Sequence, residues 1–287
     1  MKTRNRGFSL GELLVVVAIM AILSAILLPV FRSAKASAQR VACIQNFSSA
    51  RLASGLYLND YDDRFMMTSY QAASNRNSQN DRTWVQLILP YSRDFSMFKC
   101  PGDFTERPRP ETTFDLDLVP GDTYSRYYRA SQRSNIGYNT IYLAPAVAVA
   151  QGIYQPQPRM ASQATDPSNT LMFIDSVWSV VGGTPRGGGN FVVSPPCRYQ
   201  AGTNADSFKS GNEADVYTAN VSQWEMRNGD IKDFGGAWPW HTGRMNVARV
   251  DGSSKSMNPP RLTDGCNFGS RWSGLITDAS SYMWDLN

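Results

Sequence analysis

Apolar residues are concentrated in one stretch near the start of the chain. Sixteen consecutive uncharged residues occupy positions 13–28, and the longer stretch 8–31 is interrupted only by Glu12, a few small residues and Pro29. As a helix, the longer stretch would span about 36 Å, more than the roughly 30 Å core of a bilayer. We therefore predict a membrane-spanning helical segment over residues 8–31.

The helical pattern continues beyond this segment but becomes amphipathic. Polar residues separate apolar residues at helical spacing, namely Val41, Ile44, Phe47, Leu52 and Leu56. This predicts a single helix over residues 8–58 whose second half packs under a globular head. Pro29 removes one backbone hydrogen bond, so we expect a kink or local melting there.

Residues 59–287 have a strand-and-turn pattern. Clusters of Pro, Gly, Asn and Ser separate short apolar runs at 84–89, 95–98, 136–143, 171–174, 191–193 and 246–250. The pattern predicts an α+β fold in which a mostly antiparallel sheet packs on the long helix. We expect loops over residues 107–133, 144–167 and 182–211.

Composition and charge exclude several classes of protein. Apolar residues make up 42% of the chain and charged residues 18%, which excludes disorder of the whole chain. The net charge is +4, but Lys2, Arg4 and Arg6 contribute three of the 28 cationic residues, which leaves 25 against 24 acidic residues over positions 8–287. A nucleic-acid partner is therefore not expected.

The segment from Gly7 to Val17, GFSLGELLVVV, resembles the processing motif of type IV prepilins. The resemblance implies a leader at residues 1–7, cleavage after Gly7 by a prepilin peptidase, and N-methylation of Phe8. Glu12 is then the fifth residue of the mature chain and the assembly residue of the family. Gly11 departs from the pattern, which usually has a large apolar residue there.

Glu12 needs a partner if it lies within the membrane, because such a charge costs about 2.5–3.5 kcal/mol at mid-bilayer. In the pilin mechanism this partner is the amino terminus of a neighbouring subunit. A local alternative is a helix cap, because Ser9 and Glu12 have the spacing of a capping box.

Two other interpretations of the N-terminus remain open. One is a secretory signal cleaved after Ala36-Ser37-Ala38, although its apolar stretch would be unusually long. The other is an uncleaved membrane anchor.

The C-terminal half carries a second resemblance. His241, nine residues and then Asp251-Gly252 reproduce the H-X9-DG pattern of a bacterial prepilin-like family with a large domain of unknown function, over residues 241–252. The resemblance implies a pilin-like fold and no known catalytic activity. From the residues alone, Asp251-Gly252 predicts a two-residue hairpin turn. His241 is the only histidine, and a structural contact, a ligand contact and a metal or catalytic role all remain open.

Two further groups of residues are candidates for weaker sites. Asp60, Asp62 and Asp63 could hold calcium, but an EF-hand glycine is missing, so a turn or helix cap is the alternative. Four tryptophans, at positions 224, 238, 240 and 272, belong by default to a core, although an exposed subset could stack on sugars. We expect neither a catalytic site nor a tightly bound metal or other cofactor.

The cysteines lack the C-x-x-C spacing of a zinc ribbon. If the head lies outside the cytoplasm, as the prepilin resemblance implies, disulfides persist there. Of the three possible pairings, we expect Cys43 with Cys100 and Cys197 with Cys266.

These features favour a pilin-like or pseudopilin structural subunit and not an enzyme. The resemblance implies a single-pass inner-membrane protein with an extracytoplasmic head, later found in a periplasmic or cell-surface filament. The implied partners are copies of itself or other pilin-like subunits, the prepilin peptidase and methylase, an inner-membrane assembly platform and the lipid bilayer. The alternative is a membrane-anchored extracytoplasmic binding domain, with carbohydrate as one candidate ligand, that does not polymerise.

Overall fold

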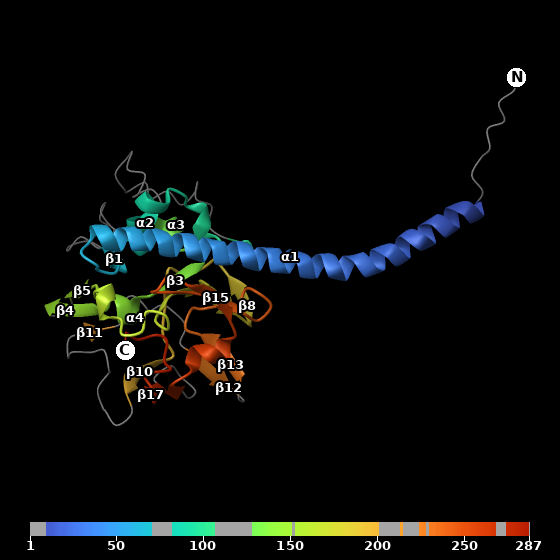
Figure 1. The fold of residues 1–287 in the computed structure, drawn as a ribbon. Coiled ribbons are helices and arrows are strands. Elements are labelled where there is room, and N and C mark those ends of the chain that lie inside the picture. Colours follow the sequence, from blue (N-terminus) through green and yellow to red (C-terminus); the bar gives the residue numbers. More distant parts are fainter. Residues whose placement is uncertain are drawn as a thin grey trace, which may run out of the picture.

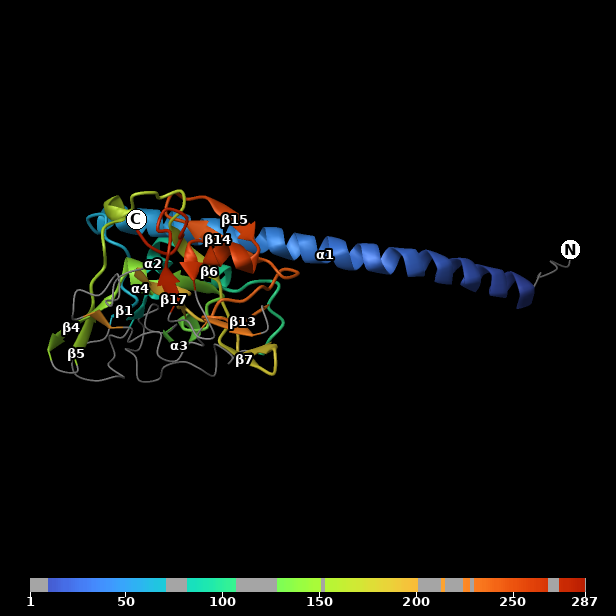
Figure 2. The same ribbon diagram turned by 90° about the horizontal axis from the view of Figure 1, so that it is seen from below.

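The computed structural model describes residues 10–70, 82–106, 128–150, 153–200, 213–214, 224–227, 230–267 and 274–286. One long helix, α1 (Leu10–Asp60), carries a head on its C-terminal half, while its N-terminal half projects away from the head (Figure 1). The view from below shows the same separation (Figure 2). The chain therefore has the shape of a stalk with a head at one end.

Helix α1 changes character along its length, as the sequence predicts. Every described side chain from Leu10 to Lys35 is exposed, and the first buried one belongs to Cys43. The buried residues of α1 are Cys43, Phe47, Ala50, Ala53, Ser54, Tyr57 and Leu58. The helix ends two residues later than predicted, and its helical conformation continues through Pro29 without a break. Local melting at Pro29 is not observed, and a localised kink stays a prediction for the chain in a bilayer.

A five-stranded sheet forms the centre of the head. Its strands, in spatial order, are β15 (Ser254–Met257), β14 (Met245–Arg249), β6 (Leu171–Asp175), β3 (Ile136–Asn139) and β9 (Val192–Val193). All neighbours pair antiparallel except β3 and β9, which are parallel. The prediction of a mostly antiparallel sheet packed on the helix is confirmed.

Both faces of this sheet are buried. On one face, Phe47 and Tyr57 of α1 pack with Trp84, Phe173 and Ala248 in one hydrophobic cluster. On the opposite face, a second cluster contains residues from the C-terminal segment. Strand β14 shows the alternation directly, because Met245 and Val247 belong to the second cluster and Ala248 to the first. The central strands are therefore held from both sides.

Smaller sheets surround the central one. They comprise β1 (Ser69–Tyr70) with β2 (Arg82–Thr83), β7 (Ser179–Val181) with β8 (Thr184–Arg186), β12 (Trp224–Arg227) with β13 (Asp230–Phe234), β11 (Glu213–Ala214) with β4 (Ala146–Ala150) and β5 (Ile153–Pro156), and β10 (Cys197–Gln200) with β17 (Gly274–Ile276) and β16 (Cys266–Asn267). Two of the predicted loops are thus partly wrong, because 144–167 contains β4 and β5 and 182–211 contains β8, β9 and β10. Most of the third, 107–133, lies outside the described residues.

The apolar run 84–89 is a helix and not the predicted strand. Helix α2 (Trp84–Ser92) begins after Thr83, whose backbone N–H donates to Gln86 Oε1 at 3.0 Å. It ends at Arg93, which adopts a left-handed conformation and donates its N–H to Leu89 O. A short apolar run does not distinguish a buried strand from a buried helix.

Short helical segments complete the head. They are η1 (Ser96–Phe98), α3 (Tyr128–Ser131), α4 (Thr140–Leu143), η3 (Ala161–Gln163) and η4 (Pro259–Thr263). The prediction of a strand is wrong for the run 95–98, which forms the 3₁₀ helix η1. It is right only for the first half of the run 136–143, which divides into β3 and α4.

Candidate functional site: the stalk and its junction with the head

The exposed half of α1 is the largest apolar surface in the described part of the chain. Helix α1 is the one described helix that is long and apolar enough to cross a membrane, and none of its most apolar 18-residue window is buried. Glu12 lies in its first turn. Exposed apolar side chains on this scale mark a surface that lipid or another protein covers.

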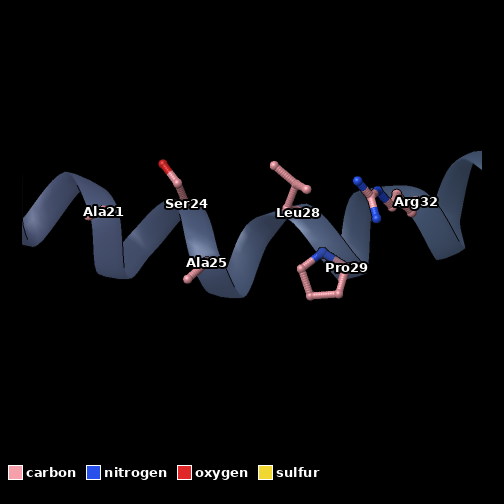
Figure 3. A pocket seen from close by; sticks show the side chains of 6 residues that line it. All are labelled: Ala21, Ser24, Ala25, Leu28, Pro29 and Arg32. Carbon is pink, nitrogen blue, oxygen red and sulfur yellow. The ribbon is translucent and has the colours of Figure 1, made fainter.

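The middle of the stalk has a shallow hollow on one side. Its lining residues are Ala21, Ser24, Ala25, Leu28, Pro29 and Arg32 (Figure 3). Small side chains here leave the helix backbone accessible to a neighbouring helix, which is a common feature of helix packing in membranes. The hollow lies on a single helix and encloses no ligand site.

The disulfide Cys43–Cys100 joins the stalk to the head. Two hydrogen bonds flank it, from Gln39 Nε2 to Pro101 O at 2.9 Å and from Asn46 Nδ2 to Lys99 O at 3.2 Å. These contacts bind residues 99–101 to two consecutive turns of α1, from Gln39 to Asn46. The predicted pairing of Cys43 with Cys100 is confirmed.

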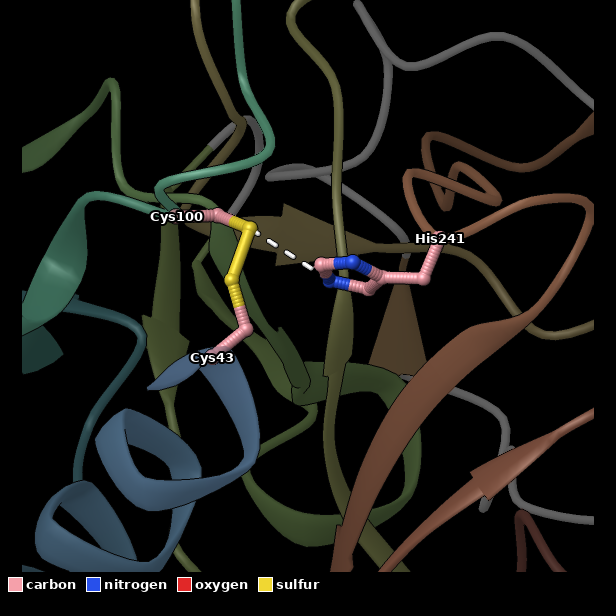
Figure 4. Close-up of side chains that lie close together, drawn as sticks. All are labelled: Cys43, Cys100 and His241. Carbon is pink, nitrogen blue, oxygen red and sulfur yellow. Dashed lines mark hydrogen bonds between the residues drawn. A yellow bond between two sulfur atoms is a disulfide. The ribbon is translucent and has the colours of Figure 1, made fainter. Parts of the chain in front are cut away.

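His241 lies directly against this disulfide (Figure 4). Its Nε2 is 3.4 Å from Cys100 Sγ and 3.7 Å from Asp175 Oδ2, and the side chains of His241 and Asp175 are both buried. Burial and the nearby charge of Arg40 lower the pKa of His241 to about 4. Burial raises the pKa of Asp175, and a hydrogen bond from Asn246 N–H opposes this effect only in part.

Close packing of the His241 ring depends on Gly102. A β-carbon at this position would lie 3.1 Å from His241 Cε1 and 3.4 Å from Cys100 Sγ. Gly102 therefore leaves the room that the ring occupies beside the disulfide.

The other end of the H-X9-DG region also contacts α1. Arg51 donates from Nε to Arg249 O at 3.2 Å and to Val250 O at 3.0 Å, and its Nη2 also donates to Val250 O. Burial lowers the pKa of Arg51, and the charge of Asp251 opposes this shift. The guanidinium thus binds the carbonyl groups at the end of β14.

The turn at Asp251-Gly252 differs from the predicted two-residue hairpin. Arg249 N–H donates to Ser253 O and closes a three-residue loop, Val250 to Gly252, one residue before β15 begins at Ser254. Gly252 adopts φ +97°, as the third residue of such a connection requires. Asp251 Oδ1 accepts from Ser253 N–H at 2.8 Å and stabilises the turn.

His241 and the Asp251-Gly252 turn therefore act at two points on the same helix. The His241 ring lies within 4.8 Å of Cys43 Sγ, and the carbonyls of Arg249 and Val250, just before the turn, accept from Arg51. Cys43 and Arg51 lie eight positions or about 12 Å apart along the helix axis. The described contacts give the pattern a structural role at this junction, which is one of the roles left open by the sequence.

Replacing Arg51 with methionine is expected to lower the free energy of unfolding by about 2 kcal/mol, because Val250 O would lose charged hydrogen bonds. Urea unfolding of the full chain in detergent, followed by tryptophan fluorescence, measures the loss. Lys232→Met is the matched control, because it removes only an exposed ion pair with Asp230 and should change stability by about 0.5 kcal/mol or less. Equal effects of the two substitutions would contradict the assignment.

The three candidate calcium ligands do not converge on one point. Asp60 Oδ2 accepts from Tyr91 O–H at 2.7 Å, and Asp63 Oδ2 accepts from Ser162 N–H at 2.8 Å. Asp62 and Asp63 both adopt positive φ angles. This arrangement is the turn that the sequence left as the alternative, and it joins the end of α1 to η3.

The second predicted disulfide, Cys197–Cys266, is also confirmed and joins β10 to β16, far from the stalk. Of the four tryptophans considered above, Trp224 is buried, whereas Trp238 and Trp240 are half-buried and pack edge-to-face. Trp272 lies outside the described residues, as do Gly7 and Phe8.

Sequence reasoning missed Asp175, Arg51 and Gly102. An arginine on the packed face of a helix was a detectable signal for Arg51, because a buried cation requires a partner. Nothing in the sequence indicated that β6 would place Asp175 beside His241, since 66 residues separate them.

Comparison with known families supports the assignment of the N-terminus. Residues 2–28 match the family described as the prokaryotic N-terminal methylation motif. No curated protein and no solved structure was found to match the chain. The matched segment supports a prepilin-like N-terminus, and α1 is the one helix among the described residues that could anchor the chain in a membrane.

Proposed function

We propose that this protein is a type IV pilin-like structural subunit that assembles into a pilus or a type II secretion pseudopilus. The observation that carries the proposal is an exposed apolar stalk with Glu12 in its first turn, whose N-terminal part lies within the matched methylation motif, residues 2–28. In this role the chain is a substrate of the prepilin peptidase and is not itself an enzyme. We also propose that residues 241–252 are the H-X9-DG region of a prepilin-like head.

The stalk supports this function because its described apolar side chains are exposed and the described residues of the head do not cover them. Lipid covers them while the protein is anchored in the membrane, and neighbouring stalks replace lipid after assembly. Glu12 determines the register, because its charge pairs with the amino terminus of Phe8 in an adjacent subunit. The hollow beside Pro29 gives a neighbouring helix room for close approach.

The proposed location rests on the prepilin-like N-terminus, and the charges around the stalk add weak support. Lys2, Arg4 and Arg6 precede the apolar segment and Arg32, Lys35 and Arg40 follow it, so the flanking charges favour a cytoplasmic start only weakly. In this proposal the head lies outside the cytoplasm. Both disulfides fit such a compartment. The partners are then the peptidase and methylase, an assembly platform in the inner membrane, and other pilin-like subunits.

Intact-mass analysis of the protein from its native membrane is the first test. We expect a chain that lacks residues 1–7 and carries one additional methyl group on Phe8. A start at Gln39 would indicate a secreted protein, and an unprocessed chain would indicate a simple anchor for a binding domain. Either result would contradict the proposal, and Gly7→Val should block processing.

A further inference from the structure

We propose that reduction of the Cys43–Cys100 disulfide creates a Zn²⁺ site whose ligands are Cys43, Cys100, His241 and Asp175. The site would hold the stalk to the head by metal coordination when the covalent bond is absent. This inference does not depend on the proposed function, because it concerns the junction within one chain.

The ligand atoms already lie close together. The two sulfur atoms and an imidazole nitrogen lie within 4.8 Å of one another, and all three residues are buried. In tetrahedral zinc sites, bond lengths of about 2.3 Å to sulfur and about 2.0 Å to nitrogen separate these two ligand atoms by about 3.5 Å. The observed separation between Cys100 Sγ and His241 Nε2 is 3.4 Å.

Asp175 is the candidate for the fourth position, although its carboxylate lies outside the group of atoms that are all within 4.8 Å of one another, so its side chain has to shift towards the sulfurs. Its Oδ2 lies 3.7 Å from the same imidazole nitrogen, and its side chain is fully buried. Among the residues that the structure describes, Asp175 Oδ1 has no hydrogen-bond partner. A buried carboxyl oxygen without a hydrogen-bond partner is open to a cation or a donor.

The arrangement differs from a catalytic triad in its use of the imidazole. In a triad, the nucleophile contacts one ring nitrogen and the carboxylate contacts the other. Here Cys100 Sγ and Asp175 Oδ2 both approach His241 Nε2. The approach of sulfur and oxygen to the same ring nitrogen is compatible with coordination of all three groups to one ion.

Charge and backbone geometry also fit the ion. Two thiolates and one carboxylate around Zn²⁺ leave one net negative charge, and Arg40, whose charge contributes to the lowered pKa of His241, is a nearby cation of opposite sign. The Cα atoms of Cys43 and Cys100 lie 5.3 Å apart, so side-chain rotation can separate the sulfur atoms once their bond is broken.

The chemistry balances with a dithiol or a phosphine as reductant. Cleavage of the S–S bond takes up two electrons and two protons and gives two thiols. A dithiol reductant becomes a disulfide, and a phosphine becomes its oxide with oxygen from water. Zn²⁺ then binds both sulfurs as thiolates and Asp175 as a carboxylate, and the two thiol protons are released to solvent, together with the proton of Asp175 when that group is protonated.

The test uses the full chain in detergent, reduced with a water-soluble phosphine and freed of metal. We expect it to bind one Co²⁺ per chain, with a thiolate-to-cobalt charge-transfer absorption and the visible bands of a tetrahedral site, and Zn²⁺ should displace the cobalt. Mass spectrometry after alkylation should show that Zn²⁺ protects Cys43 and Cys100 but not Cys197 and Cys266.

Variants then identify the ligands. The double variant Cys197→Ser/Cys266→Ser should bind Co²⁺ as the wild type does. Adding His241→Asn should weaken binding at least tenfold and change the visible bands, and Asp175→Asn should weaken it about tenfold. Without stoichiometric binding, or with equal protection of all four cysteines, the proposal is overturned, whether or not the reduced head remains folded.

Discussion

Replacing Glu12 with valine is expected to leave membrane insertion of the chain intact and to abolish its incorporation into filaments. Valine lengthens the apolar stretch and removes a charge, so the helix should partition into the bilayer at least as well as before. The loss should appear only at assembly, where the carboxylate is proposed to pair with the Phe8 amine of a neighbour.

The size of this effect follows from the cost of a carboxylate in lipid. A carboxylate costs about 2.5–3.5 kcal/mol at mid-bilayer on insertion scales, and less near the interface. Pairing with an amino terminus removes this cost only when two stalks align in one register. Without Glu12, apolar packing alone gives many registers of similar energy.

Membrane fractionation and imaging of sheared filaments measure the two steps separately. Leu14→Val is the matched control, because it introduces the same residue at an exposed position on the same helix without removing a charge. We expect the control to assemble normally and Glu12→Gln to fail as Glu12→Val does. Filaments of normal abundance from Glu12→Val would contradict the role of Glu12 and this part of the proposed function.

The sequence predicted the elements that depend on local pattern. The long helix follows from an apolar run and then a helical period, and these signals are independent of the rest of the fold. Residues 171–174 and 246–250 formed central strands because their apolar runs are short and bounded by turn residues. The Asp251-Gly252 turn was located correctly although its length was not.

The elements that were missed depend on contacts between distant segments. Trp84 begins a helix because Thr83 and Gln86 form its first turn and because the apolar residues pack against α1. The junction itself combines α1, the Cys100 segment, β6 and the region around His241. Spacing along the chain contains no information about that convergence, so Asp175 and Arg51 were not predicted.

Removal of the Cys43–Cys100 disulfide by the double variant Cys43→Ala/Cys100→Ala should lower the free energy of unfolding by about 4 kcal/mol in the chain-entropy account. The bridge closes a loop with a sequence separation of 57, and Cys197–Cys266 closes one of 69. Because the loops are similar in length, Cys197→Ala/Cys266→Ala is a matched control with a similar expected loss.

The two double variants should differ in which segment of the backbone exchanges hydrogen faster. Cys43–Cys100 holds the segment of α1 from Gln39 to Asn46, together with the two flanking hydrogen bonds. Its loss should therefore increase backbone hydrogen exchange over residues 39–46, while contacts of Arg51 keep the next two turns protected. The control should leave exchange over residues 39–46 unchanged, because Cys197 and Cys266 lie on β10 and β16. Equal exchange over residues 39–46 in both variants would show that the disulfide does not couple the stalk to the head.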